Sequence, residues 1–478
     1  MTNRKVFSSF FWRLAERCGA QGVTFIVSIV LARLLEPNVY GTIALVTAIT
    51  AIFQVFIDGG MASALIQKKN ADDMDFSTCF YANITVCIIL YVGVFIAAPA
   101  IANFYGSSEL TPIIRVLSLT LIISGVKNVQ QAYVSRNMLF KRFFFATLGG
   151  TVGAAIVGIA MAYAGYGVWA LVAQQLFNQT VDTIILWVTV KWRPQREFSF
   201  ERLKGLFGFG WKMLVSGLLE SLYNNMRQLI IGKVHSGEEL AYYNQGDKIP
   251  GIVVTNINAA INSVLLPAMA KEQDSGQRVK NMTRRAIKTS VYVMAPILMG
   301  ICFAAEPLVR LLLTDKWLPC VPFFRIFCIH YMFFPIHTAN LSAITAMGRS
   351  DLFLKQEILK IVVGIAMIAS TVQFGVIAMA YGLLVTSVMC QVINAWPNRK
   401  LINYSYLEQM KDILPIIILA VIMGATVNIV GIFHLPDILT LGIQVILGGA
   451  IYVMESIVFK VEPFQYLLVF VRSYIPEK

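Results

Sequence analysis

The chain has 478 residues, of which 57% are hydrophobic and only 14% are charged, and its formal net charge is +13. So little charge excludes a soluble protein of this length, which needs more polar surface. Apolar runs of about 20 residues, enough to cross a bilayer, recur along the whole chain. The composition therefore predicts an all-α polytopic membrane protein. No cleavable signal peptide is expected, because "MTNRK" leads into a span that lacks a small-residue cleavage site.

Fourteen membrane-spanning helices are predicted in chain order. They lie at about 9–33, 40–66, 79–102, 111–135, 143–164, 167–190, 209–232, 246–268, 286–305, 320–345, 354–373, 376–396, 411–432 and 438–459. Turn residues separate them, as in "EPNVYG", "AGYGVW" and "HLPD".

Basic residues are distributed unequally between the two sets of loops. The N-terminus, the even-numbered loops and the C-terminus hold most of them, among them Lys68, Lys69, Arg136, Lys141 and Arg142. The opposite loops hold only Arg33, Lys233, Lys248, Arg310 and Lys316. The positive-inside rule then places both termini in the cytoplasm. Most of the positive charge is thereby explained by topology, and no nucleic-acid partner is expected.

The two halves of the chain resemble each other. "VGIAM" occurs at 157–161 and again at 363–367, and "IIRVLSL" at 113–119 is similar to "FFRIFCI" at 323–329. The offset of roughly 200–210 residues corresponds to six helices, so both halves cross the membrane in the same sense. We predict two six-helix lobes, 1–200 and 201–398, related by a pseudo-two-fold axis along the membrane normal, followed by two extra helices and a cytoplasmic tail in 399–478.

Polar side chains recur every three or four residues in the first helices of each half. The first helix carries Arg13, Glu16, Arg17, Gln21, Thr24 and Ser28, and its counterpart carries Lys212, Ser216, Glu220, Asn224 and Arg227. The helices that follow carry Thr47, Thr50, Gln54 and Asp58, and Lys248, Thr255, Asn258 and Asn262. This spacing places each set on one helix face. Because charge at membrane depth is costly, we predict one hydrophilic cavity between the lobes.

The charges predicted within the membrane are mainly positive, which favours an anionic passenger. Arginine binds phosphate through its planar fork, and amides suit sugar hydroxyls. The candidate substrate-binding residues are Arg13, Arg17, Gln21, Gln54, Arg115, Lys127, Lys212, Asn224, Arg227, Asn258, Asn262 and Arg325, with His330 and His337 as further candidates. Glu220 is the first candidate for ion coupling, followed by Glu16 and Asp58. No catalytic residue, metal or cofactor is expected beyond a coupling proton or sodium ion.

Structural roles compete with these assignments. Anchoring at the membrane interface is the alternative role for the residues near the helix ends, namely Arg13, Lys212, Arg115, Arg227 and Arg325. The alternative role of Glu16 is to neutralise Arg13 or Arg17, and that of Glu220 is to form a hydrogen bond between helices. Asp58 in "DGG" fits a cap or hinge, and the two histidines fit core packing.

Three tracts resemble a known family. "LLEPNVYGTIAL", "FIDGGMASALIQKKN" and "ISGVKNVQQAYVSRNMLFKRFF" are similar to the polysaccharide transporter family of oligosaccharide flippases, which includes the colanic-acid (Wzx-type) exporters. That family belongs to the superfamily that also contains multidrug and lipid II flippases. The resemblance implies alternating-access transfer of an undecaprenyl-diphosphate-linked oligosaccharide to the outer leaflet of the bacterial inner membrane, for capsule, exopolysaccharide or O-antigen synthesis. It also implies membrane lipids, a polysaccharide polymerase and chain-length machinery as partners.

Two other functions compete with the flippase. A multidrug exporter for organic cations would need a more acidic, aromatic-lined cavity, which the excess of positive residues disfavours. A membrane polymerase or ligase would need a sizeable external loop with reactive groups, and the predicted outer loops are short. The sequence therefore predicts a transporter and not an enzyme.

Overall fold

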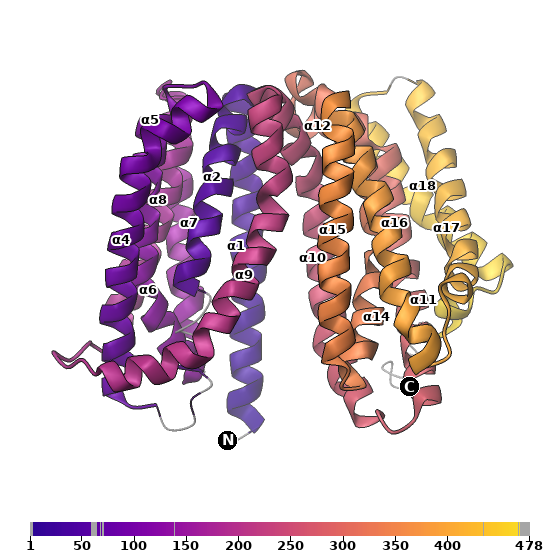
Figure 1. Cartoon of the computed structure of the whole chain (residues 1–478). Coiled ribbons are helices and arrows are strands. Elements are labelled where there is room, and N and C mark those ends of the chain that lie inside the picture. Colours follow the sequence, from indigo (N-terminus) through magenta and orange to yellow (C-terminus); the bar gives the residue numbers. More distant parts are fainter. Residues whose placement is uncertain are drawn as a thin grey trace. The chain divides into compact units, whose positions relative to one another are not determined.

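A computed structural model describes residues 3–58, 65–66, 68, 71–137, 139–433, 435–466 and 468. It describes no side chains for residues 3–18, 58, 140, 209, 212, 260, 263–264 and 350. Every regular element in the described part of the chain is a helix (Figure 1). The contacts divide the chain into two compact units, Met1–Ala241 and Tyr242–Lys478.

The described residues of the first unit form eight helices and the start of a ninth. They are α1 (Asn3–Leu34), α2 (Pro37–Asp58), α4 (Asp73–Tyr105), α5 (Leu110–Leu117), α6 (Leu119–Arg136), α7 (Phe140–Tyr163), α8 (Val168–Thr189), α9 (Phe200–Val234) and the beginning of α10 (Gly237–Lys271). Helix α7 packs between α1 and α8, and α6 packs between α4 and α8. Helix α9 packs against α2 and α4.

The second unit contains the remainder of the chain. After α10 come α11 (Gly276–Phe303), α12 (Ala305–Leu313), η1 (Asp315–Cys320), α13 (Val321–Met332), α14 (Phe334–Ala346), α15 (Ser350–Thr371), η2 (Val372–Phe374), α16 (Val376–Leu401), α17 (Tyr406–Asn428), η3 (Ile429–Phe433) and α18 (Asp437–Val458). Helix α11 packs against α17, α15 against α16, and α18 against α12 and α17.

A helix lies at each of the fourteen predicted positions, which confirms the all-α fold class. Nine spans within the described residues are long and apolar enough to cross a membrane. The long helices outside this set, α1, α8, α9, α10 and α15, carry many of the polar side chains. The total of fourteen crossings stays a prediction.

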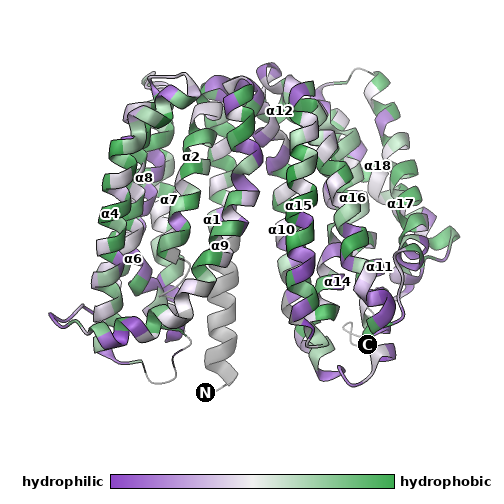
Figure 2. Cartoon of the chain, viewed as in Figure 1, coloured by the Kyte–Doolittle hydropathy of each residue, from purple (hydrophilic) through white to green (hydrophobic). Residues whose placement is uncertain are grey.

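Much of the surface of both units is apolar. Figure 2 shows α4, α17 and α18 largely in the green of hydrophobic residues. Ile96 on α4 is 71% exposed and Ile446 on α18 is 76% exposed. Contiguous exposed apolar surface on this scale is unfavourable in water and favourable against acyl chains. The chain is therefore a multi-span membrane protein.

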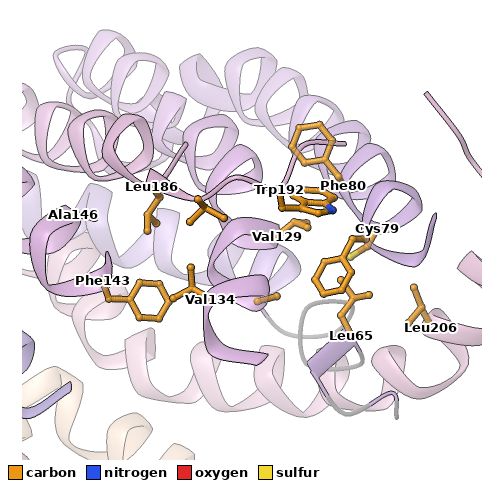
Figure 3. Packing of buried hydrophobic residues seen from close by; sticks show 13 residues of the cluster. Leu65, Cys79, Phe80, Val129, Val134, Phe143, Ala146, Leu186, Trp192 and Leu206 are labelled. Carbon is orange, nitrogen blue, oxygen red and sulfur yellow. The ribbon is translucent and has the colours of Figure 1, made fainter. Parts of the chain in front are cut away.

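A cluster of buried hydrophobic residues from several helices packs together in the first unit (Figure 3). Trp192 lies near its centre, with ring centroids 5.7 Å from Phe76 and 6.3 Å from Tyr133. Val129 and Leu186 bring α6 and α8 into the same cluster and are fully buried. Their burial fixes the relative rotation of these two helices, whose preceding turns carry the polar residues described below.

The segment between α8 and α9 is bonded to α4. The backbone N–H of Gln195 donates to Ser77 Oγ at 2.9 Å, and the backbone N–H of Ser199 donates to Thr78 Oγ1 at 3.2 Å. Arg202 at the start of α9 forms ion pairs with Asp72 and Asp75. These contacts, with those of α9 on α2, place α9 in the first unit. The predicted lobe boundaries at 200 and 398 concern the internal repeat and stay predictions.

Candidate functional site

A polar chamber of about 430 Å³ lies inside the first unit, between α2, α6 and α8. Its lining residues are Thr47, Thr50, Ala51, Gln54, Thr120, Ser124, Lys127, Gln131, Gln175, Asn178 and Gln179. The size falls in the range of roughly 300–1,000 Å³ that is usual for small-molecule sites. Ten of the eleven side chains are polar and none is aromatic.

Helix α2 forms one wall with Thr47, Thr50, Ala51 and Gln54, spaced by one helical turn. The Thr50 hydroxyl donates to the Val46 carbonyl at 3.1 Å, within its own helix. Its oxygen therefore keeps acceptor capacity for a group inside the chamber. Leu45 lies on the opposite face of α2, where it is buried beside Gly232 of α9 and helps to hold the helix in this rotation.

Helix α6 forms the second wall with Thr120, Ser124, Lys127 and Gln131. Two neighbouring amides point away from the chamber and anchor the helix. Asn128 Nδ2 donates to the Ile57 carbonyl at 3.1 Å, and Gln130 Nε2 donates to the Trp192 carbonyl at 3.1 Å. These buried bonds select the face of α6 that is left for the chamber.

Helix α8 forms the third wall with Gln175, Asn178 and Gln179. It lies very close to α7, because a Cβ atom added at Gly150 would be 2.8 Å from Asn178 Oδ1 and 3.0 Å from the Asn178 carbonyl oxygen. Only glycine at position 150 allows this approach.

The side chains of Gln131, Gln175 and Asn178 have no hydrogen-bond partner among the described residues, so their amides are available to a ligand.

Lys127 is neutralised inside the chamber wall. Its Nζ atom donates to Gln179 Oε1 at 2.6 Å and to Asp182 Oδ2 at 3.0 Å. The Lys127 side chain is 10% exposed and that of Asp182 is 13% exposed. A buried cation needs such a partner, because an unpaired charge in a low-dielectric interior is costly. The chamber therefore has many hydrogen-bonding groups and no formal net charge.

Two of the predicted site residues, Gln54 and Lys127, line this chamber. Gln21 lies exposed on α1. Arg115 lies on α5, outside the chamber lining, where its Nε donates to the Phe95 carbonyl at 3.2 Å and its guanidinium lies 4.2 Å from the centre of the Phe95 ring.

The residues predicted on α9 lie along that helix outside the chamber lining. Glu220 and Asn224 are exposed. Arg227 is half-buried, and its Nε atom is buried without a hydrogen-bond partner among the described residues. The side chains of Arg13, Glu16, Arg17, Asp58 and Lys212 lie outside the described part of the structure.

In the second unit, Asn258 is buried on α10, and neither of its side-chain amide atoms has a partner among the described residues. Asn262 accepts a 3.0 Å bond from Ser342 Oγ. Arg325 is exposed on α13. His330 contacts the Tyr331 ring, with centroids 4.8 Å apart, and His337 Nδ1 bonds Asn394 Nδ2. The described residues contain no group of three or more His, Cys, Asp or Glu side chains suited to a metal ion.

The sequence reasoning missed the polar face of α8. Gln175, Asn178, Gln179 and Asp182 recur every three or four residues, the same spacing that identified the faces of α1, α2, α9 and α10. It also missed Thr120, Ser124 and Gln131, which share the face of Lys127. Applying the same spacing rule to every predicted helix would have found both sets.

The family model of a polysaccharide biosynthesis protein matches residues 30–322. The chain belongs to this family. It is 25% identical over 381 residues to the teichuronic acid biosynthesis protein TuaB of Bacillus subtilis (strain 168), covering 78% of each chain. It is 22% identical over 396 residues to the lipopolysaccharide biosynthesis protein WzxC of Escherichia coli (strain K12), covering 82% of this chain and 79% of the relative.

The structure also superposes on that of the lipid II flippase MurJ in an inward closed conformation, with a TM-score of 0.75. The match covers 96% of this chain and 99% of MurJ at 13% sequence identity, so it shows a shared fold. This member of the polysaccharide biosynthesis family therefore has the membrane-transporter fold that its sequence resemblance implied.

Proposed function

We propose that the protein is a flippase that moves an undecaprenyl-diphosphate-linked oligosaccharide from the cytoplasmic to the outer leaflet of the bacterial inner membrane. The observation that carries the proposal is the polar chamber between α2, α6 and α8, enclosed by helices of a multi-span protein of the polysaccharide biosynthesis family. In this proposal both termini are cytoplasmic, as the distribution of lysine and arginine predicts.

The chamber addresses the main physical barrier to moving a glycolipid. Sugar hydroxyls that enter the hydrocarbon region without partners lose several hydrogen bonds to water, and each loss is costly. Threonine, glutamine and asparagine side chains replace those bonds inside the protein. The polyprenyl tail requires no such replacement, since it is as apolar as the bilayer interior.

Other candidate residues keep their proposed roles. The diphosphate is assigned to the cationic candidates Arg13, Arg17, Arg115, Lys212, Arg227 and Arg325, with Gln21, Asn224, Asn258 and Asn262 as polar neighbours. Ion coupling is assigned to Glu220, with Glu16 and Asp58 as the alternatives, and the coupling ion is a proton or sodium. Transport by a Glu220→Gln variant that remains fully gradient-dependent would remove Glu220 from this role.

The flippase explains the chamber better than the competing functions. A site for organic cations would be lined by aromatic rings and unpaired carboxylates, whereas this chamber has no aromatic lining residue and its adjacent carboxylate, Asp182, is paired with Lys127. We propose no catalytic step for the chain. A polysaccharide polymerase and chain-length machinery would use the translocated product.

Deletion of the gene tests the proposal. We expect a polyprenyl-diphosphate-linked oligosaccharide to accumulate in lipid extracts, with its glycan protected from hydrolases added to intact spheroplasts and accessible in inverted vesicles. Complementation with the wild-type gene should remove the accumulation. Accumulation of a glycan that is already exposed on the outer face would indicate a block in polymerisation and contradict the flippase.

A further inference from the structure

The lining of the chamber between α2, α6 and α8 suits the sugar part of a glycolipid cargo better than its diphosphate. We propose that it is a subsite for the uncharged sugar residues of the cargo, and that the diphosphate binds elsewhere. This inference rests on the proposed function, because it states which part of that cargo the chamber holds.

The state of Lys127 argues against a phosphate in this chamber. Two of its three donor positions already serve Gln179 Oε1 at 2.6 Å and Asp182 Oδ2 at 3.0 Å. A phosphate that approached Lys127 would also approach the Asp182 carboxylate, and two negative charges repel each other, most strongly where side chains are as little exposed as these two. The same repulsion disfavours an acidic sugar, whose carboxylate would leave the chamber with an uncompensated negative charge.

The remaining lining argues for hydroxyl-rich ligands over apolar ones. Ala51 is the one apolar side chain among the eleven lining residues. An apolar ligand would cover Gln131, Gln175 and Asn178 and leave their amides without partners. A sugar ring offers both donors and acceptors to these amides, and the volume of about 430 Å³ admits a small number of such rings.

The chamber also lies within one compact unit of the chain, the first. All three walls lie between Thr47 and Gln179, and the buried anchors Asn128 and Gln130 hold α6 in place. Such support fixes the positions of the binding groups before the cargo arrives.

Binding measurements on the full-length protein in lipid nanodiscs test the subsite. The probes are the lipid-linked oligosaccharide purified from the deletion strain and undecaprenyl diphosphate without sugar. We expect a Gln175→Leu/Asn178→Leu variant to lose about tenfold or more in affinity for the glycolipid, and to bind undecaprenyl diphosphate as the wild type does. Gln174→Leu is the matched control, because Gln174 lies on the same helix and, like Asn178, packs beside a glycine of α7, but it does not line the chamber.

A second measurement uses charge. Undecaprenyl-diphosphate-glucose and undecaprenyl-diphosphate-glucuronate are compared on the wild type, Asp182→Asn and Lys127→Met/Asp182→Asn. The wild type should prefer the glucose probe. Asp182→Asn should shift the preference toward the glucuronate probe by about tenfold, because Lys127 then has no carboxylate partner and can pair with the acidic sugar. The double variant, which has neither charge, should restore the preference for the glucose probe. Its binding of that probe would also show that the altered site still folds.

The outcomes separate the inference from the function it rests on. Equal losses for both lipids in Gln175→Leu/Asn178→Leu, no loss at all, or an unchanged sugar preference in Asp182→Asn would overturn the subsite and leave the flippase intact. An accumulated glycan composed only of acidic sugars would also overturn it. Failure of the wild type to bind any polyprenyl diphosphate, together with no accumulation in the deletion strain, would overturn the flippase itself.

Discussion

Asp72 illustrates how single residues fix the start of α4. Its carboxylate caps the helix by accepting from the Asp75 amide at 3.0 Å, and it pairs with Arg202 at the start of α9. Asp75 is fully buried beside it and bonds Lys68 at 2.7 Å and Arg202 at 3.2 Å. The hydrogen bond from Arg202, followed by that from the Asp75 amide, lowers the pKa of Asp72 to about 2 from 3.8.

We expect Asp72→Asn to lower the melting temperature near neutral pH. Asparagine remains a good N-cap, so the change removes mainly the charge. Because the pKa is lowered in the folded protein, the carboxylate stabilises the fold above pH 3.8, and this contribution is lost as the pH falls toward 2. Thermal unfolding of wild type and variant in detergent should therefore differ at pH 5–7, and the difference should shrink as the pH falls to about 2.

Glu109→Gln is the control for this series. Glu109 also occupies the N-cap position of a helix, α5, but its side chain makes no capping hydrogen bond. Its substitution should leave the melting temperature nearly unchanged across the same pH range. A difference between Asp72→Asn and wild type that stays constant down to pH 2 would contradict the electrostatic origin.

At the residue scale, the sequence identified Gln54 and Lys127 in the candidate site but not Asp182, the carboxylate that pairs with Lys127. Spacing placed Gln54 on the correct face of α2, and the rarity of lysine in a span identified Lys127. The pairing of Lys127 with Asp182 joins residues 55 positions apart on different helices, which no local pattern reveals. The sequence therefore assigned Lys127 to an anion, whereas the structure shows it already paired.

At the scale of elements, helix contacts depend on glycine at points of very close approach. A Cβ atom added at Gly41 of α2 would be 1.8 Å from the carbonyl oxygen of Gly237, the first residue of α10. A backbone atom cannot move aside as a flexible side chain can. The beginning of α10 is therefore held against α2 by the absence of a side chain.

We expect Gly41→Ala to destabilise the protein by about 1–3 kcal/mol, because the added methyl group overpacks this contact. The readout is the thermal unfolding temperature in detergent, which should fall by a few degrees. Gly22→Ala is the matched control, since a Cβ atom there meets nothing within 4 Å and alanine favours helix. A melting temperature for Gly41→Ala equal to that of wild type would contradict the predicted clash.

The sequence was a good guide to elements and a poorer guide to their neighbours. Hydrophobic runs and turn residues located the long helices, because membrane-spanning segments are long and uniform. They did not predict the short helix α12 or the division of 111–135 into α5 and α6. The docking of the segment between α8 and α9 onto α4 was not predictable, since it depends on Ser77 and Thr78, two small hydroxyls that resemble ordinary helix residues. Contacts of this kind determine that α9 belongs with the first unit.

At the scale of the whole molecule, the distribution of basic residues predicts the topology. We expect alkaline phosphatase to be active when fused after Ser107, in the turn between α4 and α5, because this segment is predicted to face outward. A fusion after Gln195, between α8 and α9, should be inactive, and green fluorescent protein at the C-terminus should fluoresce. Activity at Gln195 would reverse the predicted orientation.

The internal repeat, the number of crossings and the lobe boundaries are also properties of the whole chain. The sequence predicts them through a constant offset between weak matches such as "VGIAM" at 157–161 and 363–367. The superposition on the MurJ structure confirms the transporter fold over nearly the whole chain. Physical reasoning from composition reaches the fold class, whereas the proposed preference for uncharged sugars depends on side-chain pairings such as that of Lys127 with Asp182.

The compactness of the chamber along the chain has an evolutionary consequence. Every group that lines it is encoded between codons 47 and 179, and Asp182 follows within one helical turn. A single recombination crossover near codon 241, at the end of the first unit, would exchange the complete chamber between two homologous genes together with α9 and the start of α10, which pack against α2. If the chamber holds the sugars as we propose, hybrid transporters built in this way would inherit their sugar preference from one parent.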